Sequence, residues 1–249
     1  MKFAASCGQN VLASMSGTDM FEPLTLCIKD LVDIPENDYW LGDGEREVLA
    51  GLRFTKRRND WRLGRWTAKL AALAFLHIKN ESDLSLFEIR AASDGAPEVF
   101  IRNKPAEVAI SISHAGRRSF CVAGPPCMAP GCDIELLEPR GELLAMDYFT
   151  HEEIEFVRTA APEHKVLVTN FIWSAKESVL KALREGLRRD TRSICIQPGL
   201  TRIFHCQEIV GLEEHKNVWS RWTGICRQTS REFHGHWRAD SRFVYTFCL

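Results

Sequence analysis

Three acidic residues and one lysine are spaced so that they could act together on a charged substrate. Asp133 and Glu135 alternate with apolar residues between Gly131 and Leu136, a pattern that predicts a strand with both carboxylates on one face. Glu177 and Lys181 lie four residues apart in a segment whose apolar residues recur every three or four positions, which predicts a helix. Neighbouring carboxylates repel each other unless a cation or a proton lies between them.

Such a set of groups suits a magnesium-assisted reaction at a phosphate. Mg²⁺ prefers hard oxygen ligands in octahedral geometry and keeps waters and substrate phosphates among them. A lysine nearby can neutralise charge on a leaving phosphate. Taken alone, however, Glu177 and Lys181 are equally compatible with a solvated salt bridge on a helix surface.

Together, the two segments resemble the paired signature of the 4'-phosphopantetheinyl transferases, in particular the type that activates surfactin synthetase. The signature consists of Gly-x-Asp-x-Glu at residues 131–135 and Trp-Ser-x-Lys-Glu-Ser-x-x-Lys at residues 173–181. A third segment, Ser-His-x-Gly at residues 113–116, resembles a further signature of the family and follows a predicted strand at residues 108–113.

The resemblance implies an α/β (α+β) fold made of two similar subdomains in a pseudo-twofold arrangement, each with a mostly antiparallel sheet packed with helices. We expect residues 1–126 to contribute to coenzyme A binding and residues 127–249 to carry the metal and catalytic residues, with the cofactor in the cleft between them. The second half repeats the first in outline, as strands, helices and strands, without a visible residue-level repeat.

The resemblance also implies a magnesium-dependent holo-[acyl-carrier-protein] synthase. Such an enzyme transfers the 4'-phosphopantetheine arm of coenzyme A to a serine of an apo acyl or peptidyl carrier protein and releases 3',5'-ADP. Asp133, Glu135 and Glu177 are expected to bind Mg²⁺, with Mn²⁺ as an alternative, and Lys181 to hold the leaving phosphate. Asp133, Glu177 and Lys181 form the expected catalytic set, and Glu177 serves as ligand, as base toward the serine, or as both.

Coenzyme A contacts are expected from the same resemblance. The residues assigned to it are Arg62, Lys69, Gly95, Pro97, Ser113, His114 and Lys181. The first two lie in a helix predicted from Asn59 or Asp60 to Leu76, and the basic run at residues 53–58 before it is either a solvated face or part of an anion site. Family members commonly carry Gly-Lys-Pro in the turn at residues 95–97, and this chain has Ala96 in place of the lysine.

The carrier protein is expected to dock just after the acidic strand. Carrier proteins usually present an acidic helix beside the serine, so the docking surface should be apolar with basic edges. The residues that suit this surface are Leu136, Leu137, Arg140, Leu143, Leu144 and Met146.

Composition excludes several other classes. The 249 residues are 26% charged and 45% hydrophobic with a formal net charge of −1, so we expect no nucleic-acid partner. The nine cysteines include no Cys-x-x-Cys pair, which favours reduced, buried thiols of an intracellular protein. Without a run of about eighteen apolar residues we expect no membrane span, and we expect a cytoplasmic monomer.

Two other readings use the same residues. A magnesium-dependent nucleotide or nucleic-acid phosphohydrolase would need the same acidic groups and would act without a carrier protein. A non-catalytic homologue that merely binds carrier proteins or coenzyme A would tolerate the loss of a carboxylate, and all three carboxylates are present here.

Overall fold

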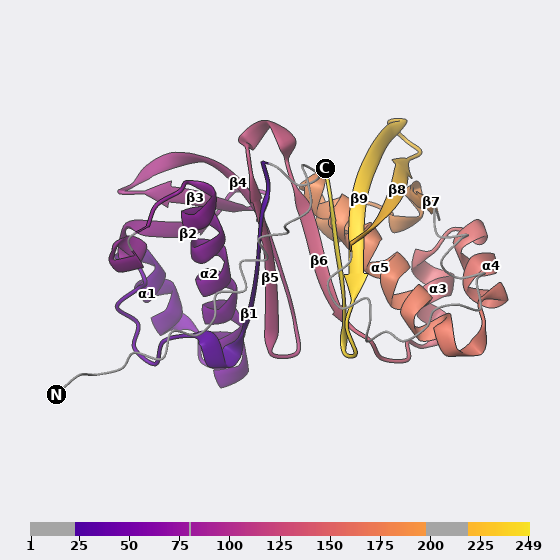
Figure 1. The fold of residues 1–249 in the computed structure, drawn as a ribbon, viewed down its shortest axis with the longest axis horizontal. Helices are drawn as coiled ribbons and strands as arrows, with labels where there is room; N and C mark the ends of the chain where they lie inside the picture. The colour runs from indigo at the N-terminus through magenta and orange to yellow at the C-terminus, as the bar shows by residue number, and fades with distance from the viewer. Residues whose placement is uncertain (1–22, 80, 198–218) are drawn as a thin grey trace.

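The computed structural model describes residues 23–79, 81–197 and 219–249 and divides them into two halves that lie side by side (Figure 1). The first half contains β1 (Thr25–Asp30), α1 (Asp43–Gly51), α2 (Thr55–Phe75), β2 (Phe87–Ala91), β3 (Pro97–Ile101), β4 (Lys104–Ala115) and β5 (Arg118–Gly124). The second half contains β6 (Gly131–Leu136), α3 (Glu142–Tyr148), α4 (His151–Thr159), α5 (Lys165–Ala182), β7 (Ile194–Gln197), β8 (Ser220–Cys226), β9 (Arg231–Ala239) and β10 (Phe243–Cys248).

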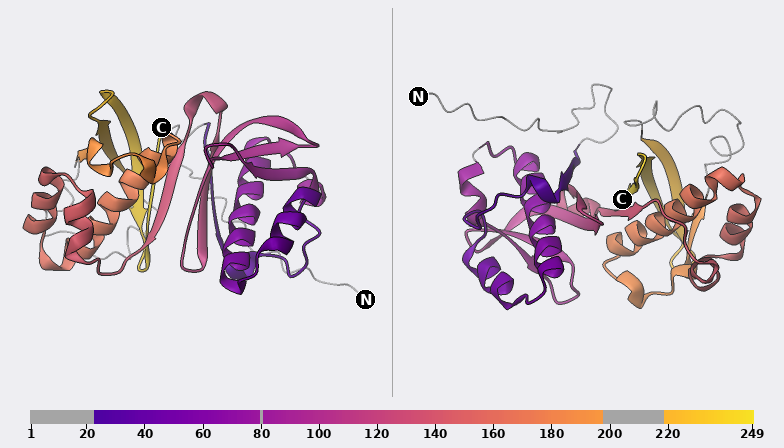
Figure 2. Two further views of the ribbon diagram at one scale, coloured as in Figure 1. Left: turned by 180° about the vertical axis from the view of Figure 1, so that it is seen from behind. Right: turned by 90° about the horizontal axis from the view of Figure 1, so that it is seen from below.

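The two sheets have the same topology. Their strand orders are β1-β5-β4-β3-β2 and β6-β10-β9-β8-β7, and all the pairings are antiparallel. In both halves the first strand is followed by helices and then by four strands, and one long helix packs on the sheet: α2 in the first half and α5 in the second (Figure 2). The predicted fold class is therefore confirmed. The predicted boundary at residue 126 falls in the short connection between β5 and β6.

Each half holds a buried lysine–glutamate pair at the corresponding place. Lys69 on α2 lies 2.5 Å from Glu45 at the third position of α1, and Lys176 on α5 lies 2.9 Å from Glu153 at the third position of α4. All four side chains are at most 3% exposed. Each glutamate also accepts a backbone N–H from the N-cap of its own helix and another from β2 or β7. These hydrogen bonds satisfy charges that would otherwise be costly to bury.

The two buried lysines belong to a residue-level repeat that the sequence analysis overlooked. Trp-Thr-Ala-Lys at residues 66–69 and Trp-Ser-Ala-Lys at residues 173–176 occupy the two long helices. A repeat of four residues is too short to be recognised from the sequence. In the structure the two segments are equivalent, because the lysine of each one pairs with a buried glutamate at the third position of another helix. In the repeat, Leu70 follows Lys69 whereas Glu177 follows Lys176. The first half therefore has no acidic residue at the position that corresponds to Glu177.

The contacts between the halves include an apolar cluster and the hydrogen bonds of Arg118. Phe120 of β5 packs against Tyr245 of β10, with ring centroids 5.8 Å apart. Arg118 donates to Asp30 in its own half and to Asp240 in the other half, at 2.7 and 3.1 Å. These contacts hold β5 of the first half against β10 of the second, and β10 is paired with the acidic strand β6, which itself contacts β4 and β5.

Several predicted elements differ from the observed ones. Because α2 begins at Thr55, the predicted cap at Asn59 or Asp60 is wrong, and the basic residues 56–58 occupy the first turn of the helix. The sequence analysis missed β9, whose charged residues alternate with the buried side chains of Phe233 and Trp237. A strand predicted at residues 202–205 lies outside the described residues.

Other expectations hold. The sequence also predicts a capping box of Thr150 and Glu153, which is confirmed, and it favours core positions for Trp219 and Trp222, which are 8% and 1% exposed. No helix within the described ranges combines the length and apolar character that a membrane span requires.

Candidate active site

The site forms where α5 lies directly on β6. A Cβ atom on Gly131 would come within 1.9 Å of the backbone oxygen of Ser178, so the helix can approach the strand this closely only because residue 131 is glycine. Small side chains line the facing side of α5: the hydroxyls of Ser174 and Ser178 lie 2.9 and 2.7 Å from that of Thr246, which is paired with Asp133 across the sheet. The glycine and serines of the two sequence motifs therefore set the distance between strand and helix.

Asp133 is the centre of the polar contacts. Its Oδ1 accepts a hydrogen bond from Lys181 Nζ at 2.8 Å and another from Ser113 Oγ at 2.7 Å. Lys181 also donates to the backbone oxygen of Cys132 at 3.0 Å, which leaves one ammonium N–H for a ligand. Ser113 lies near the end of β4 in the first half, so this group of three side chains bridges the two halves.

Glu177 lies one helical turn before Lys181 and is the most perturbed acid of the site. Burial, together with repulsion from Asp133 and Glu135, raises the pKa of Glu177 from 4.5 to about 7, although Lys181 opposes the shift. Burial and Asp133 also raise the pKa of Glu135. For Lys181, burial alone would lower the pKa, but the attraction of Asp133 outweighs it and the pKa is raised. The site therefore carries more negative charge than its one lysine balances.

A divalent cation fits this arrangement. Asp133 Oδ2 is buried and has no hydrogen-bond partner among the described residues, and the Glu177 carboxylate has no hydrogen bond within the same ranges. An unpaired buried carboxylate oxygen beside a second carboxylate is the hard-oxygen environment that Mg²⁺ or Mn²⁺ prefers, and a cation there would relieve the repulsion that raises the pKa of Glu177. As the side chains stand, no three His, Cys, Asp or Glu residues of the described ranges are grouped to hold a metal ion.

Glu135 makes hydrogen bonds of its own. It shares a strand face with Asp133, as predicted, but both of its oxygens are occupied: Oε2 by Arg140 Nη2 at 2.5 Å and Oε1 by Trp173 Nε1 at 2.8 Å. The structure thus brings Asp133, Glu177 and Lys181 together and directs Glu135 to other partners.

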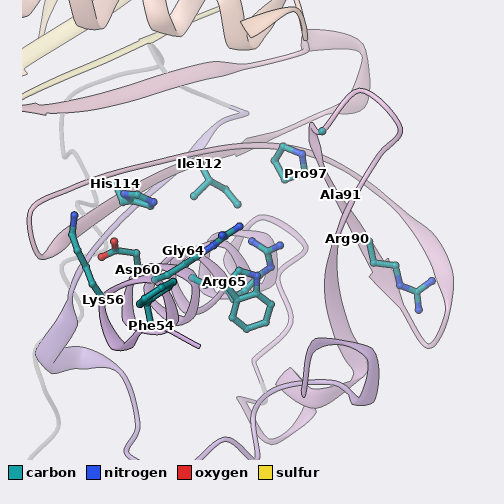
Figure 3. Close-up of a pocket in the computed structure, with 13 residues that line it drawn as sticks. Phe54, Lys56, Asp60, Gly64, Arg65, Arg90, Ala91, Pro97, Ile112 and His114 are labelled. Atoms are coloured by element: carbon teal, nitrogen blue, oxygen red, sulfur yellow. The ribbon is translucent and has the colours of Figure 1, made fainter. Parts of the chain in front are cut away.

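A cavity of about 720 Å³ opens beside this group on the first half (Figure 3). Figure 3 shows side chains of α2 on one side of it and Ile112 and His114 of β4 on the other. The residues that line it are Phe54, Lys56, Arg57, Asp60, Trp61, Gly64, Arg65, Arg90, Ala91, Gly95, Pro97, Ile112 and His114. The cavity combines apolar and aromatic walls with several cations, so it suits a flat apolar group that carries phosphates.

A second cavity, of about 520 Å³, adjoins the first. The two cavities share Gly95, Pro97 and Ile112, and Lys181 lines the second one. Arg184, which follows α5, and Asp94 of the first half also line the second cavity, and Arg184 donates to Asp94 at 2.8 Å. The second cavity therefore has residues of both halves in its wall.

Two residues predicted to bind coenzyme A lie elsewhere. Lys69 is completely buried and donates to the backbone oxygens of Trp40 and Leu84 besides its pair with Glu45, so its ammonium cannot reach a ligand in this structure. Arg62 lies 2.9 Å from Asp38 and lines neither cavity. These two expectations are corrected here. Lys69 points into the core of the first half, and Arg62 donates to the backbone oxygen of Pro35 at 2.7 Å besides its pair with Asp38.

Of the other residues expected to contact coenzyme A, Gly95, Pro97 and His114 line the first cavity, Lys181 lines the second, and Ser113 holds Asp133. Sequence reasoning did not assign Arg57 or Arg65 to the site, although both belong to basic segments that it noted. Helical spacing is the signal that could have found them: with α2 beginning at Thr55, residues 57, 61, 64 and 65 recur at spacings of three and four.

Comparison with known proteins points to one superfamily. Residues 129–248 match the family model of the 4'-phosphopantetheinyl transferase superfamily (ACPS). Among solved structures, holo-[acyl-carrier-protein] synthase of Helicobacter pylori in complex with coenzyme A is similar, with 16% identity and a TM-score of 0.33, covering 41% of this chain and 98% of that chain. No curated protein matches the chain. The matched residues include β6 and α5, and therefore Asp133, Glu177 and Lys181.

Proposed function

We propose that this protein is a 4'-phosphopantetheinyl transferase of the surfactin-synthetase-activating type. It moves the phosphopantetheine arm of coenzyme A to a serine hydroxyl of an apo carrier protein. The observation that carries the proposal is the meeting of Lys181 with Asp133 and Glu177, with Lys181 in the lining of the second cavity, within residues that match the superfamily. The arrangement of the chain in two halves further supports the surfactin-synthetase-activating type, because residues of both halves line the second cavity.

In the proposed reaction, the serine oxygen attacks the β-phosphorus of the pyrophosphate. A new oxygen–phosphorus bond forms, and the bond from that phosphorus to the bridging oxygen breaks, which releases 3',5'-ADP. Glu177 accepts the serine proton, and its pKa of about 7 keeps a substantial ionised fraction at neutral pH. Lys181, held by Asp133, places its remaining N–H toward the leaving phosphate.

Asp133 and Glu177 would hold Mg²⁺, or Mn²⁺, because the buried Asp133 Oδ2 and the neighbouring Glu177 carboxylate have no hydrogen-bond partner among the described residues. When bound, the ion supplies positive charge to the pyrophosphate oxygens. The protein's own contribution is positioning: Gly131 and the small residues of α5 fix both carboxylates relative to each other, and Ser113 fixes Asp133 relative to the first half.

We place the adenosine 3'-phosphate part of coenzyme A in the first cavity, with Arg57, Arg65 and His114 as its cationic or polar contacts. Arg57→Gln should then weaken the binding of coenzyme A by about tenfold, because one charge-assisted hydrogen bond is lost. The binding of dephospho-coenzyme A should weaken far less. Arg53 is exposed and outside the cavity, so Arg53→Gln is the matched control. An equal loss of affinity for both ligands would mean that the 3'-phosphate does not bind at Arg57.

The carrier protein is proposed to dock on α3, beside the end of β6. Leu143 and Met146 of the predicted surface are 69% and 64% exposed, whereas Leu137 and Leu144 pack against the core. Met146→Asp should raise the KM for an acidic carrier without changing coenzyme A binding. Val32, 81% exposed in the first half, provides the control substitution Val32→Asp.

The decisive experiment incubates the protein with coenzyme A, Mg²⁺ and a panel of apo carriers from fatty-acid, polyketide and nonribosomal-peptide synthesis, and weighs the products. One carrier should gain the mass of phosphopantetheine, and Glu177→Gln should reduce the rate by about 100-fold or more. Glu155→Gln on the exposed face of α4 is the matched control. Hydrolysis of coenzyme A or a nucleotide without any carrier would favour the phosphohydrolase instead.

A further inference from the structure

The residue that follows the C-cap of α5 has a backbone conformation that glycine usually provides. The helix ends at Ala182, and Arg184 has a φ of 57°. The backbone N–H of Arg184 donates to the oxygen of Lys181 at 2.9 Å. That of Glu185 donates to the oxygen of Leu180 at 3.1 Å, which completes the Schellman pattern. Glycine is favoured at this position because a Cβ atom is disfavoured in the left-handed region. An arginine here therefore carries a conformational cost.

The side chain of Arg184 reaches across to the first half. Its Nε and Nη2 donate to the two oxygens of Asp94 at 2.8 and 3.2 Å, and Nη2 also donates to Glu98 Oε1 at 2.9 Å. Arg188 donates to the backbone oxygen of Asp94 at 3.2 Å and to that of Arg184 at 2.9 Å. Two arginines of the second half thus hold one turn of the first.

That turn connects β2 and β3 and forms part of both cavities. The Oδ1 atom of Asp94 accepts the backbone N–H of Ala96 at 2.9 Å, and Gly95 has a φ of 88°. Gly95 and Pro97 line both cavities, so the position of the turn shapes both of them. Because β2 is an edge strand, the sheet itself holds this hairpin from one side, through β3.

Arg184 links this turn to the lysine of the candidate active site. It lies three residues after Lys181, which holds Asp133 at 2.8 Å, and the hydrogen bond between the two backbones fixes their relative position. The side chains of Arg184, Asp94 and Glu98 are 45%, 33% and 44% exposed. Ion pairs this exposed contribute little to the free energy of unfolding. A conformational cost with little return in stability indicates a role in the site.

We propose that Arg184 is a positioning residue, which clamps the turn at residues 94–97 to the end of α5 and so fixes the two cavities relative to Lys181. This inference rests on the proposed function for the identity of the ligand. Loosening the turn should lower the affinity for coenzyme A, because Gly95 and Pro97 line both cavities. Lys181 and Asp133 keep their own contact, so turnover at saturating coenzyme A should hold.

The first test compares affinity, turnover and stability in variants of Arg184. Arg184→Gln should weaken coenzyme A binding by about tenfold in isothermal titration calorimetry and leave kcat at saturation within about twofold. Arg184→Gly should bind as weakly but unfold about 2–4 °C above Arg184→Gln, because glycine suits the left-handed backbone. Arg184→Lys should restore part of the affinity. Arg158→Gln, which removes an exposed ion pair on α4, is the matched control and should leave affinity and kcat unchanged.

Asp94→Asn separates a clamp from a direct contact with the ligand. Asparagine keeps the Oδ1 atom that accepts the N–H of Ala96 but removes the charge that holds Arg184. For a clamp, this substitution should weaken coenzyme A binding by about threefold or more and add little to Arg184→Gln in the double variant. If Arg184 bound a phosphate directly, Asp94→Asn would free the guanidinium and tighten binding. Tighter or unchanged binding in Asp94→Asn would overturn the inference.

Hydrogen–deuterium exchange tests the clamp without any ligand. The backbone amides of Ala92, Gly95 and Ala96 are hydrogen-bonded within the turn. Arg184→Gln should speed their exchange by about tenfold and leave α4 unchanged. Exchange equal to that of the wild type, or unchanged coenzyme A affinity in this variant, would overturn the inference. If the wild type neither binds coenzyme A nor modifies a carrier, the proposed function fails, whereas the exchange still decides whether Arg184 holds the turn.

Discussion

The raised pKa of Glu177 predicts that the metal-free protein loses stability as the pH rises through neutrality. The folded state binds this proton more tightly than the unfolded chain, since the pKa is about 7 in the fold and 4.5 as an ordinary value. The stabilisation is fully present below pH 4.5 and is lost as the pH rises through 7. The shift corresponds to about 3 kcal/mol, of which about 2.5 kcal/mol falls between pH 5 and pH 8.

The perturbation that isolates this effect is Glu177→Gln, a neutral substitution of nearly the same shape. Urea unfolding of both proteins in the presence of a chelator, at pH 5 and at pH 8, gives the difference in free energy of unfolding at each pH. As the pH rises from 5 to 8, the free energy of unfolding of the variant should increase by about 2.5 kcal/mol relative to that of the wild type, because every other titrating group is common to both proteins. Adding Mg²⁺ at pH 8 should stabilise the wild type more than the variant.

A difference between the two proteins that does not change with pH would refute the reasoning, because it would mean that Glu177 titrates alike in the folded and unfolded states. Glu155→Gln is the informative control. Arg158 lowers the pKa of the exposed Glu155, so this substitution has the opposite pH dependence.

Three further substitutions test the supports of the site. Lys176→Met leaves Glu153 buried without its partner and should lower the free energy of unfolding by about 3–5 kcal/mol in urea; a loss below 1 kcal/mol would show that the pair is not buried in solution. Gly131→Ala should cost about 1–3 kcal/mol by thermal unfolding and also reduce carrier modification, because the new Cβ forces α5 away from β6; unchanged activity would contradict this close packing. Arg118→Gln removes the charged contacts with Asp30 and Asp240 and should cost about 2 kcal/mol, and a neutral effect would mean that these ion pairs do not stabilise the contact between the halves.

The sequence by itself determined the groups that do the chemistry. Period-two alternation placed Asp133 and Glu135 on one strand face, and a spacing of four placed Glu177 and Lys181 on one helix face; both placements hold in the structure. These are local properties, set by the geometry of a strand and a helix, so a short segment is sufficient to predict them. The antiparallel two-sheet class followed from family resemblance and is confirmed by the topology.

Tertiary structure alone decided which charged side chains reach the site. Lys69 and Arg57 are both basic residues of α2, yet Lys69 neutralises a buried glutamate whereas Arg57 lines the cavity, because they lie on different faces of the helix and meet different neighbours. Glu135 satisfies the acidic pattern but is drawn to Arg140 by a contact that depends on Asn170 of α5, 35 residues after Glu135. Whether a charge pairs internally or meets a ligand depends on partners distant in the chain, which local spacing does not encode.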